Sequence, residues 1–182
     1  MLRPWIRNVA LITVLALMAP GVVQAQALLY GGGGALFPVS DFDLTADPGF
    51  VVVTGIMFPV GGGALSVGAE GLYGKASGSG NGPSKNINGL MAYAETTFGE
   101  EGGPQPFLFG GVGMLRYDLG VLNSSETSKT SFGYQAGGGL NVAIGGIMSV
   151  WAEGRYVSAS SAAPLTPTFV SFMVGASISL GR

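Results

Sequence analysis

The sequence predicts an all-β fold, an eight-stranded antiparallel up-and-down transmembrane β-barrel, and three observations lead to this prediction. Eight stretches alternate small or apolar residues with polar residues or glycine at a period of two. The segments between them alternate short with long, as turns and loops do in transmembrane barrels. Charged residues make up 10% of the 182 residues, whereas soluble proteins average about 25%. A surface that faces lipid needs few charges.

The N-terminal segment predicts export. Two arginines precede an apolar run from Val9 to Met18, and small residues follow at a spacing that signal peptidase accepts, so we expect cleavage after Ala25 or Ala27. The run is too short for a transmembrane helix, which needs about 20 apolar residues. We therefore expect residues 1–25 to be a signal peptide and residues 26–182 to form one barrel domain.

The first three strands are expected at Ala27–Phe37, Phe50–Val60 and Ala64–Lys75. The first contains a run of four glycines, and a tight turn of three further glycines follows the second. The third strand alternates clearly, with Glu70 on the face that suits a polar lumen. The residues of its lipid-facing side are Leu65, Val67, Ala69, Gly71 and Tyr73.

The next three strands are expected at Ile87–Phe98, Phe107–Asp118 and Phe132–Ala143. The fourth turns Glu95 inward, and the fifth turns Arg116 inward, on the face opposite its aromatic residues. The side chains assigned to lipid are Leu90, Ala92, Ala94 and Phe98 in the fourth strand, Phe107, Phe109, Leu115 and Tyr117 in the fifth, and Phe132, Tyr134, Ala136, Leu140 and Val142 in the sixth.

The seventh strand is expected at Ile147–Val157. The eighth is expected after a loop that ends at Thr168, and its last outward residue is Leu180. The seventh strand turns Glu153 and Arg155 inward. The outward residues are Met148, Val150, Ala152 and Tyr156 in the seventh strand and Val170, Phe172, Val174, Ala176, Ile178 and Leu180 in the eighth.

The connections predict which end of the barrel faces outward. Those after the second, fourth and sixth strands are built of turn-forming residues, at Gly61–Gly63, Gly99–Pro106 and Ile144–Gly146. The other four are longer and polar, and we expect them to be external loops, because outer-membrane barrels have short periplasmic turns and longer external loops. These loops contain Asp41–Asp47, Ala76–Asn86, Gly120–Lys129 and Ser158–Thr168.

Five charged residues are expected in the lumen. They are Glu70, Glu95, Arg116, Glu153 and Arg155. The interior of an eight-stranded barrel is only wide enough for side chains to fill, so these charges should pair and plug it. An ion path or a catalytic pair of carboxylates is the functional alternative.

Composition excludes several kinds of site. Cysteine and histidine are absent, so the chain has no disulfide, no Ser-His-Asp or Cys-His nucleophile and no histidine-based zinc site. The glycine clusters do not match GxxxxGK[ST] or GxGxxG. With 8 basic and 10 acidic residues, no basic face for nucleic acid is expected. We expect no catalytic residue, no cofactor and no metal ligand.

Aromatic and lysine side chains have simple expected roles. Eight aromatic residues near strand ends should form girdles at the membrane interfaces, with a sugar-stacking platform as the alternative. They are Tyr30, Phe50, Phe98, Phe107, Tyr117, Phe132, Tyr156 and Phe169. Lys75, Lys85 and Lys129 are expected to be solvated or to meet lipid phosphates, rather than to form a Ser-Lys nucleophile.

Three segments resemble a known family. Phe109–Gly113, Phe132–Leu140 and Val150–Tyr156 are similar to the later strands of small eight-stranded outer-membrane barrels, the porin-family or opacity-type proteins related to the OmpA membrane domain. The resemblance implies the outer membrane of a Gram-negative bacterium, with outer-membrane lipid, lipopolysaccharide and the outer-membrane assembly machinery as partners. The chain departs from the family in ending at Leu180-Gly181-Arg182 rather than in an aromatic residue.

The sequence and the resemblance together lead to one expected function. The protein should be a non-enzymatic outer-membrane barrel with a structural role, or a surface-interaction role through its four external loops. The alternatives are a barrel enzyme that acts on membrane lipid, and a channel or carrier for a small solute or hydrophobic ligand.

Overall fold

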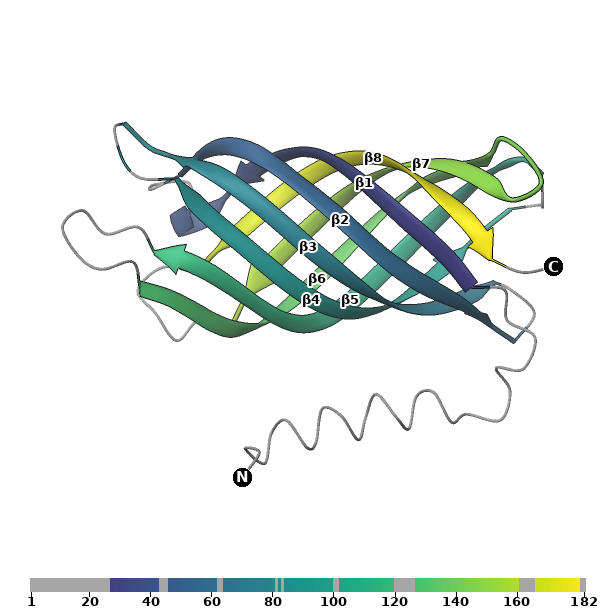
Figure 1. The fold of residues 1–182 in the computed structure, drawn as a ribbon, viewed down its shortest axis with the longest axis horizontal. Coiled ribbons are helices and arrows are strands. Elements are labelled where there is room, and N and C mark those ends of the chain that lie inside the picture. The colour runs from purple at the N-terminus through teal and green to yellow at the C-terminus, as the bar shows by residue number, and fades with distance from the viewer. Residues whose placement is uncertain are drawn as a thin grey trace, which may run out of the picture.

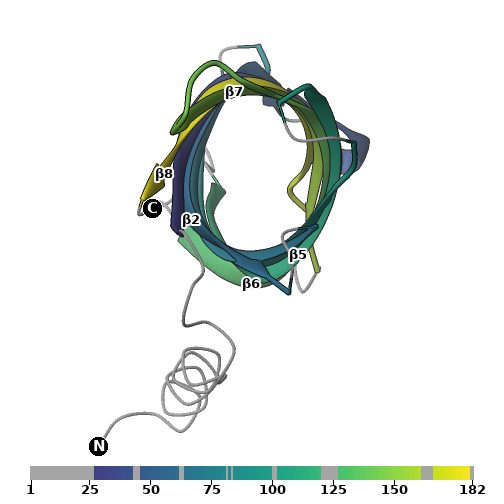
Figure 2. The same ribbon diagram turned by 90° about the vertical axis from the view of Figure 1, so that its right-hand side faces the viewer.

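The computed structural model describes residues 27–42, 46–61, 64–80, 82, 84–99, 102–119, 127–160 and 166–180, so the expected signal peptide lies outside these residues. Each strand pairs antiparallel with the next, and the last pairs with the first, which closes the barrel (Figure 1 and Figure 2). The strands are β1 (Ala27–Pro38), β2 (Ala46–Val60), β3 (Leu65–Gly78), β4 (Lys85–Thr97), β5 (Pro104–Leu119), β6 (Thr127–Ala143), β7 (Met148–Ala159) and β8 (Thr168–Leu180). The predicted fold class is confirmed.

The two ends of the barrel differ. At one end, here the turn end, lie Ala27, Leu180 and the connections 61–64, 98–103 and 144–147. At the other, the loop end, lie the connections 39–45, 79–84, 120–126 and 160–167, the first of which contains a short 3-10 helix, η1 (Ser40–Phe42). Among the described residues, no helix is long and apolar enough to cross a membrane.

Several strands extend further toward the loop end than predicted. The expected loop Ala76–Asn86 was wrong at both its ends, because β3 runs to Gly78 and β4 begins at Lys85. Ser77 pairs with Asp47, and Gly78 with Ala46, across the neighbouring strand. Such small residues form main-chain ladders without leaving an alternating pattern in the sequence. In the same way the predicted loop Ser158–Thr168 shortens to 160–167. At the turn end, β5 begins at Pro104, so the predicted turn Gly99–Pro106 becomes 98–103.

The outer face of the barrel is apolar, as lipid contact requires. Residues predicted to face lipid in β3, β4, β6, β7 and β8 do point outward, and Val174 in β8 is 67% exposed. The exposed side chains include Leu90, Leu108, Val112, Tyr134, Phe172 and Ile178. The alternation of these five strands was therefore assigned to the correct faces.

β5 is the exception, because its two faces were assigned in reverse. The side chains of Phe107, Phe109, Leu115 and Tyr117 are buried inside the barrel. Arg116 points outward and is exposed, so its predicted place in the lumen is wrong. The reason lies on β6, where inward-facing glycines leave room for rings: a Cβ added at Gly137 would lie 2.6 Å from Phe109 Cζ, and one at Gly139 would lie 2.7 Å from Phe107 Cζ.

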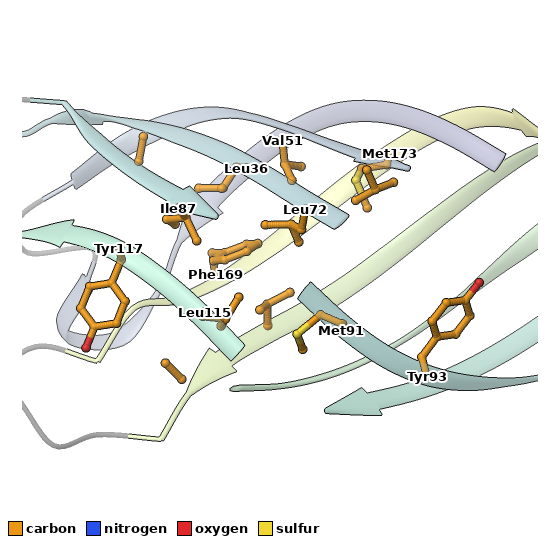
Figure 3. Close-up of a cluster of buried hydrophobic side chains, with 14 of the residues drawn as sticks. Leu36, Val51, Leu72, Ile87, Met91, Tyr93, Leu115, Tyr117, Phe169 and Met173 are labelled. Atoms are coloured by element: carbon orange, nitrogen blue, oxygen red, sulfur yellow. The ribbon is translucent and has the colours of Figure 1, made fainter. Parts of the chain in front are cut away.

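The interior of the loop half is filled with apolar side chains, which we call the apolar plug. Figure 3 shows Leu36, Leu72, Ile87, Leu115 and Phe169 pointing toward one another inside the barrel. Val51, Met91, Val157 and Met173 belong to the same buried cluster. A polar lumen was predicted, so this part of the interior differs from the expectation. The plug closes the loop half of the barrel by packing rather than by charge.

Several aromatic rings expected in the interfacial girdles lie inside the barrel. Phe50, Phe98, Phe132 and Tyr156 are exposed as predicted, but Tyr30, Phe107, Tyr117 and Phe169 face the interior. Inward rings lie against glycines of neighbouring strands. The six-membered ring of Trp151 lies over Gly32 of β1 and Gly175 of β8, which are direct partners across the β1–β8 seam. A Cβ at Gly32 would lie 2.6 Å from Trp151 Cζ2, so the narrow barrel accommodates the indole only above glycine.

Candidate functional site: the charged cluster and cavity of the turn half

The middle of the lumen, on the turn side of the apolar plug, contains a buried polar cluster that we call the lumen network. Its members come from four strands: Tyr30 of β1, Glu70 of β3, Gln135 of β6, and Glu153 and Arg155 of β7. All five positions point inward because residues of one parity face the lumen along each strand. The cluster thus joins strands that are distant in the sequence.

Arg155 is the centre of the lumen network. Its Nη1 pairs with Glu70 Oε1, and its Nη2 donates to Glu70 Oε2 at 2.9 Å, so the two side chains form a fork-to-fork pair. Its Nε donates to Glu153 Oε1 at 2.9 Å, and Nη2 lies 2.8 Å from the same oxygen. Every nitrogen of the guanidinium therefore lies against a carboxylate. The Arg155 Cζ also lies 4.8 Å from the centre of the Phe109 ring.

Neutral side chains complete the shell around Glu70. The Tyr30 hydroxyl donates to Glu70 Oε2 at 2.8 Å, and Gln135 Nε2 donates to Oε1 at 3.3 Å. Gln135 Oε1 accepts from Arg155 Nη1 at 3.0 Å. Glu70 is 1% exposed, and its charge is matched by a cation and by these two further donors, as a buried carboxylate requires.

The structure brings together three of the five predicted lumen residues. Glu70, Glu153 and Arg155 are in direct contact. The Glu95 side chain faces the same space, but no hydrogen bond or ion pair to its carboxylate exists within the described ranges. Arg116 lies on the outer face, where its Nη2 donates to Ser128 Oγ at 2.9 Å.

Sequence reasoning missed two members of the network. Tyr30 was assigned to an interfacial girdle because it lies near the start of β1, and Gln135, which alternates with the outward residues of the sixth strand, was given no role. The signal that would have found Gln135 is its register: it lies on β6 opposite Val157, two residues along β7 from Arg155, and on the same inner face.

A cavity of about 520 Å³ occupies the turn half of the lumen. Its wall includes Glu95, Glu153 and Arg155 together with the rings of Tyr93, Phe107, Phe109 and Trp151. The wall continues to Ala64 and Gly99, in the connections of the turn end, so the cavity is entered from that end. The lumen thus consists of an apolar plug, a charged cross-link and an accessible pocket, in order from the loop end.

The donor set of the pocket limits its chemistry. In the part of the chain that the structure describes, no group of three or more acidic side chains is placed to hold a metal ion. Histidine and cysteine are absent from the sequence. The carboxylate of Glu70 is enclosed by donors, which leaves Glu95 and Glu153 as the acidic groups that face the cavity.

Comparison with solved structures supports the fold. Neisserial surface protein A superposes with a TM-score of 0.68 at 15% identity, over 84% of this chain and 95% of that one. Ail of Yersinia pestis, in complex with the heparin analogue sucrose octasulfate, has a TM-score of 0.55 at 13% identity, over 86% and 99% of the two chains. The outer membrane enzyme PagL has a TM-score of 0.51 at 16% identity, over 84% and 98%. These identities establish a shared fold only.

The comparison with protein families is more specific than the structural likeness. No curated protein sequence matches the chain significantly. The family model for the outer membrane protein beta-barrel domain matches residues 9–178, which include all eight strands except the last residues of β8. The closed antiparallel barrel and its apolar outer face agree with that match and with the outer membrane of a Gram-negative bacterium. The chain belongs to the outer membrane protein beta-barrel domain family.

Proposed function

We propose that the protein is a closed, non-enzymatic barrel that holds four external loops at the cell surface and conducts no solute. The apolar plug is the observation that carries this proposal. Leu36, Ile87, Leu115 and Phe169 are fully buried within the loop half of the lumen. An ion would have to enter this tightly packed apolar layer without a hydration shell, which is energetically prohibitive.

A planar-bilayer measurement tests the closed state. The purified protein should give no stepwise conductance, and Leu115→Gly should create leakage because it removes plug volume without touching the lumen network. Val112→Gly, on the lipid face of the same strand, is the matched control and should remain silent. Regular conductance steps from the parent protein would refute the closed barrel.

Epitope insertion tests which end is outside. A tag after Gly80, at the loop end, should be detected on intact cells, and a tag after Gly145, at the turn end, should be detected only after the cells are opened. Both glycines lie in connections where an added Cβ would meet no atom within 4 Å, so both insertions should be tolerated. The reverse pattern of detection would invert the topology.

The proposal includes a lipid partner, the phosphate groups of the outer leaflet. Near the loop end, an outward-facing polar patch crosses four neighbouring strands, β3 to β6, and we call it the basic rim: Lys75, Asn88, Arg116, Ser128 and Thr130. Arg116 is the direct partner of Asn88 on one side and of Thr130 on the other. Phe50, the direct partner of Lys75, and Tyr73, the direct partner of Asn88, pack on the outer face with ring centres 6.0 Å apart. Aromatic rings next to cations are typical of the level where hydrocarbon meets headgroups.

Lipopolysaccharide added to the protein in detergent tests this partner. We expect its phosphates to raise the unfolding midpoint of the parent protein, and we expect the double variant Lys75→Gln, Arg116→Gln to lose that rise. Lipopolysaccharide without lipid A phosphates should give little stabilisation, and inorganic phosphate distinguishes a lipid headgroup from the free anion. Equal stabilisation of the parent and the double variant would refute the role of the basic rim.

The non-enzymatic part of the proposal is tested on the lipid itself. Fold does not decide the question, since PagL is described as an enzyme and shares the barrel. Mass spectra of lipid A and phospholipid from cells with and without the protein should be identical. A change in acyl chain number that depends on the protein would overturn this part and leave the closed barrel intact.

A further inference from the structure

We infer that the cavity in the turn half is a binding site for a small organic cation that carries a hydroxyl group. The inference goes beyond the proposed function, because a ligand that enters from the turn end does not need to pass the apolar plug. Three independent features of the cavity and its surroundings carry it: more acidic groups than cations, a continuous aromatic surface, and a donor and an acceptor without partners.

The first feature is the charge of the turn half. Glu70, Glu95 and Glu153 face one cation, Arg155, across this part of the lumen. Arg155 is fully committed, since each of its nitrogens lies against Glu70 or Glu153. No described residue gives the Glu95 carboxylate a hydrogen bond or an ion pair. Carboxylates enclosed by a barrel wall are stabilised by a mobile cation in the space that they face.

The second feature decides what kind of cation fits. Tyr30 packs edge to face on Trp151 and on Tyr93, with ring centres 6.3 Å and 6.1 Å apart, and Tyr93 packs similarly on Phe109 at 6.3 Å. These rings form one aromatic surface along the cavity. A metal ion would need several oxygen ligands, and among the described residues no group of three acids is placed to hold one. A weakly hydrated ammonium ion instead gains cation–π attraction from such a surface.

The third feature indicates the hydroxyl group. Trp151 Nε1 and Asn141 Oδ1 are buried, and neither has a hydrogen-bond partner in the described part of the chain. Both residues line the cavity, and they are direct partners across the β6–β7 pair. Trp151 is 8% exposed, so leaving its N–H without an acceptor costs free energy. A ligand hydroxyl at this level of the cavity can accept from the indole N–H or donate to the amide oxygen.

The size of the cavity agrees with a compact ligand. Its volume of about 520 Å³ lies within the range of small-molecule sites, about 300–1,000 Å³. The ammonium group would lie between Glu95 and Glu153, against the aromatic surface, and the hydroxyl would lie at the level of Trp151 and Asn141. Choline has this combination of groups and is the probe that we choose.

Fluorescence of Trp151 gives a direct test of binding. The sequence contains two tryptophans, Trp5 and Trp151, so the full chain is expressed with Trp5→Phe and purified from outer membranes in a nonionic maltoside detergent. Choline chloride should change the emission of Trp151 in a saturable way. Two probes separate the contributions: 3,3-dimethylbutanol, the uncharged analogue of choline, should bind weakly, and tetramethylammonium, which lacks the hydroxyl, should bind with intermediate affinity.

Variants of the acidic groups complete the experiment. Glu95→Gln should weaken choline binding about tenfold, or about 1.4 kcal/mol, and should leave the unfolding midpoint nearly unchanged because Glu95 makes no ion pair. Asp47→Asn, an exposed acid at the loop end, is the control and should bind choline as the parent does. A saturable choline response that Glu95→Gln abolishes or weakens supports the site. The absence of a saturable response would overturn the site, and this is the result expected if the cavity holds water only or if Glu95 is protonated. Equal binding of choline and its uncharged analogue would also overturn it. Either result leaves the conductance test of the closed barrel unaffected.

Discussion

At the scale of single residues, Arg155 has the largest effect on the interior, because two carboxylates depend on it. Glu70 and Glu153 both contact its guanidinium, and Glu70 is almost completely buried. A buried ion pair contributes little compared with an apolar pair of the same shape, but loss of one partner leaves an uncompensated charge in a low dielectric. The free energy of unfolding should therefore be far more sensitive to Arg155 than to other basic residues.

Replacement of Arg155 by alanine should lower the free energy of unfolding by about 3–5 kcal/mol, measured by urea unfolding of the protein in detergent micelles. Arg116→Ala is the control: Arg116 is exposed and donates one hydrogen bond, to Ser128, so its loss should change stability by about 0.5 kcal/mol or less. A neutral Arg155→Ala variant that gains ion conductance would show that the lumen network is a conduction path.

Glycines of the inner face provide a second prediction at this scale. Gly32→Ala should lower the free energy of unfolding by about 1–3 kcal/mol because its methyl group would overlap the Trp151 ring and a main-chain oxygen of β8. Gly31→Ala is the matched control, since a Cβ there would come no closer than 3.6 Å to Val53 O. Thermal unfolding followed by circular dichroism distinguishes the two. Equal midpoints for both variants would contradict the close packing of Trp151 on the seam.

At the scale of strands, the sequence was sufficient to assign the lipid and lumen faces where polar and apolar residues alternate. It was insufficient where glycines occur on both faces. β3 and β8 have one mostly apolar face and one face that is mostly small or polar, apart from the buried Leu72, Phe169 and Met173, so their orientation follows from the pattern. β5 has large apolar residues at Phe107, Phe109 and Leu115 and glycines on both faces. Its orientation depends on inward glycines of β6 that make room for rings, and this is a relation between two strands that neither shows alone.

The lipid face of β8 can be tested with a single charge. Val174→Arg should reduce the stability of the inserted barrel by about 2–4 kcal/mol if Val174 lies near the middle of the bilayer, and Thr130→Arg, near the loop end, by about 0–1 kcal/mol. Reversible unfolding from phospholipid vesicles measures both values. Similar costs at the two positions would mean that the membrane does not follow the apolar band described here.

At the scale of the whole molecule, closure was predictable, but the contents of the barrel were only partly so. The number of strands and the alternation of connection lengths suggested a closed sheet, because a sheet edge cannot remain unpaired in lipid. The contacts among Glu70, Glu153 and Arg155 followed from their heights along the strands. The apolar plug and the cavity did not follow, because they depend on which inward side chains from all eight strands meet at one level.

A closed barrel with an apolar exterior should behave as an integral membrane protein. We expect the protein to sediment with outer membranes and to stay there after extraction with carbonate or with high salt, since lipid contact and not charge holds it. Detergent should release it. Recovery of a soluble monomer from the periplasm would be incompatible with the exposed apolar face of β8.

The Trp151 ring above Gly32 and Gly175 also affects how the chain ends find each other during assembly. Before closure β1 is a glycine-rich edge strand, and a bare edge could align with β8 in several ways. A slip of two residues in one direction would bring Tyr30 in place of Gly32 beneath the indole, and the ring leaves no room for a side chain there. A slip in the other direction would move the Tyr30 hydroxyl away from Glu70, to which it donates. The two aromatic side chains thus exclude shifted alignments and select the correct register when β1 and β8 pair.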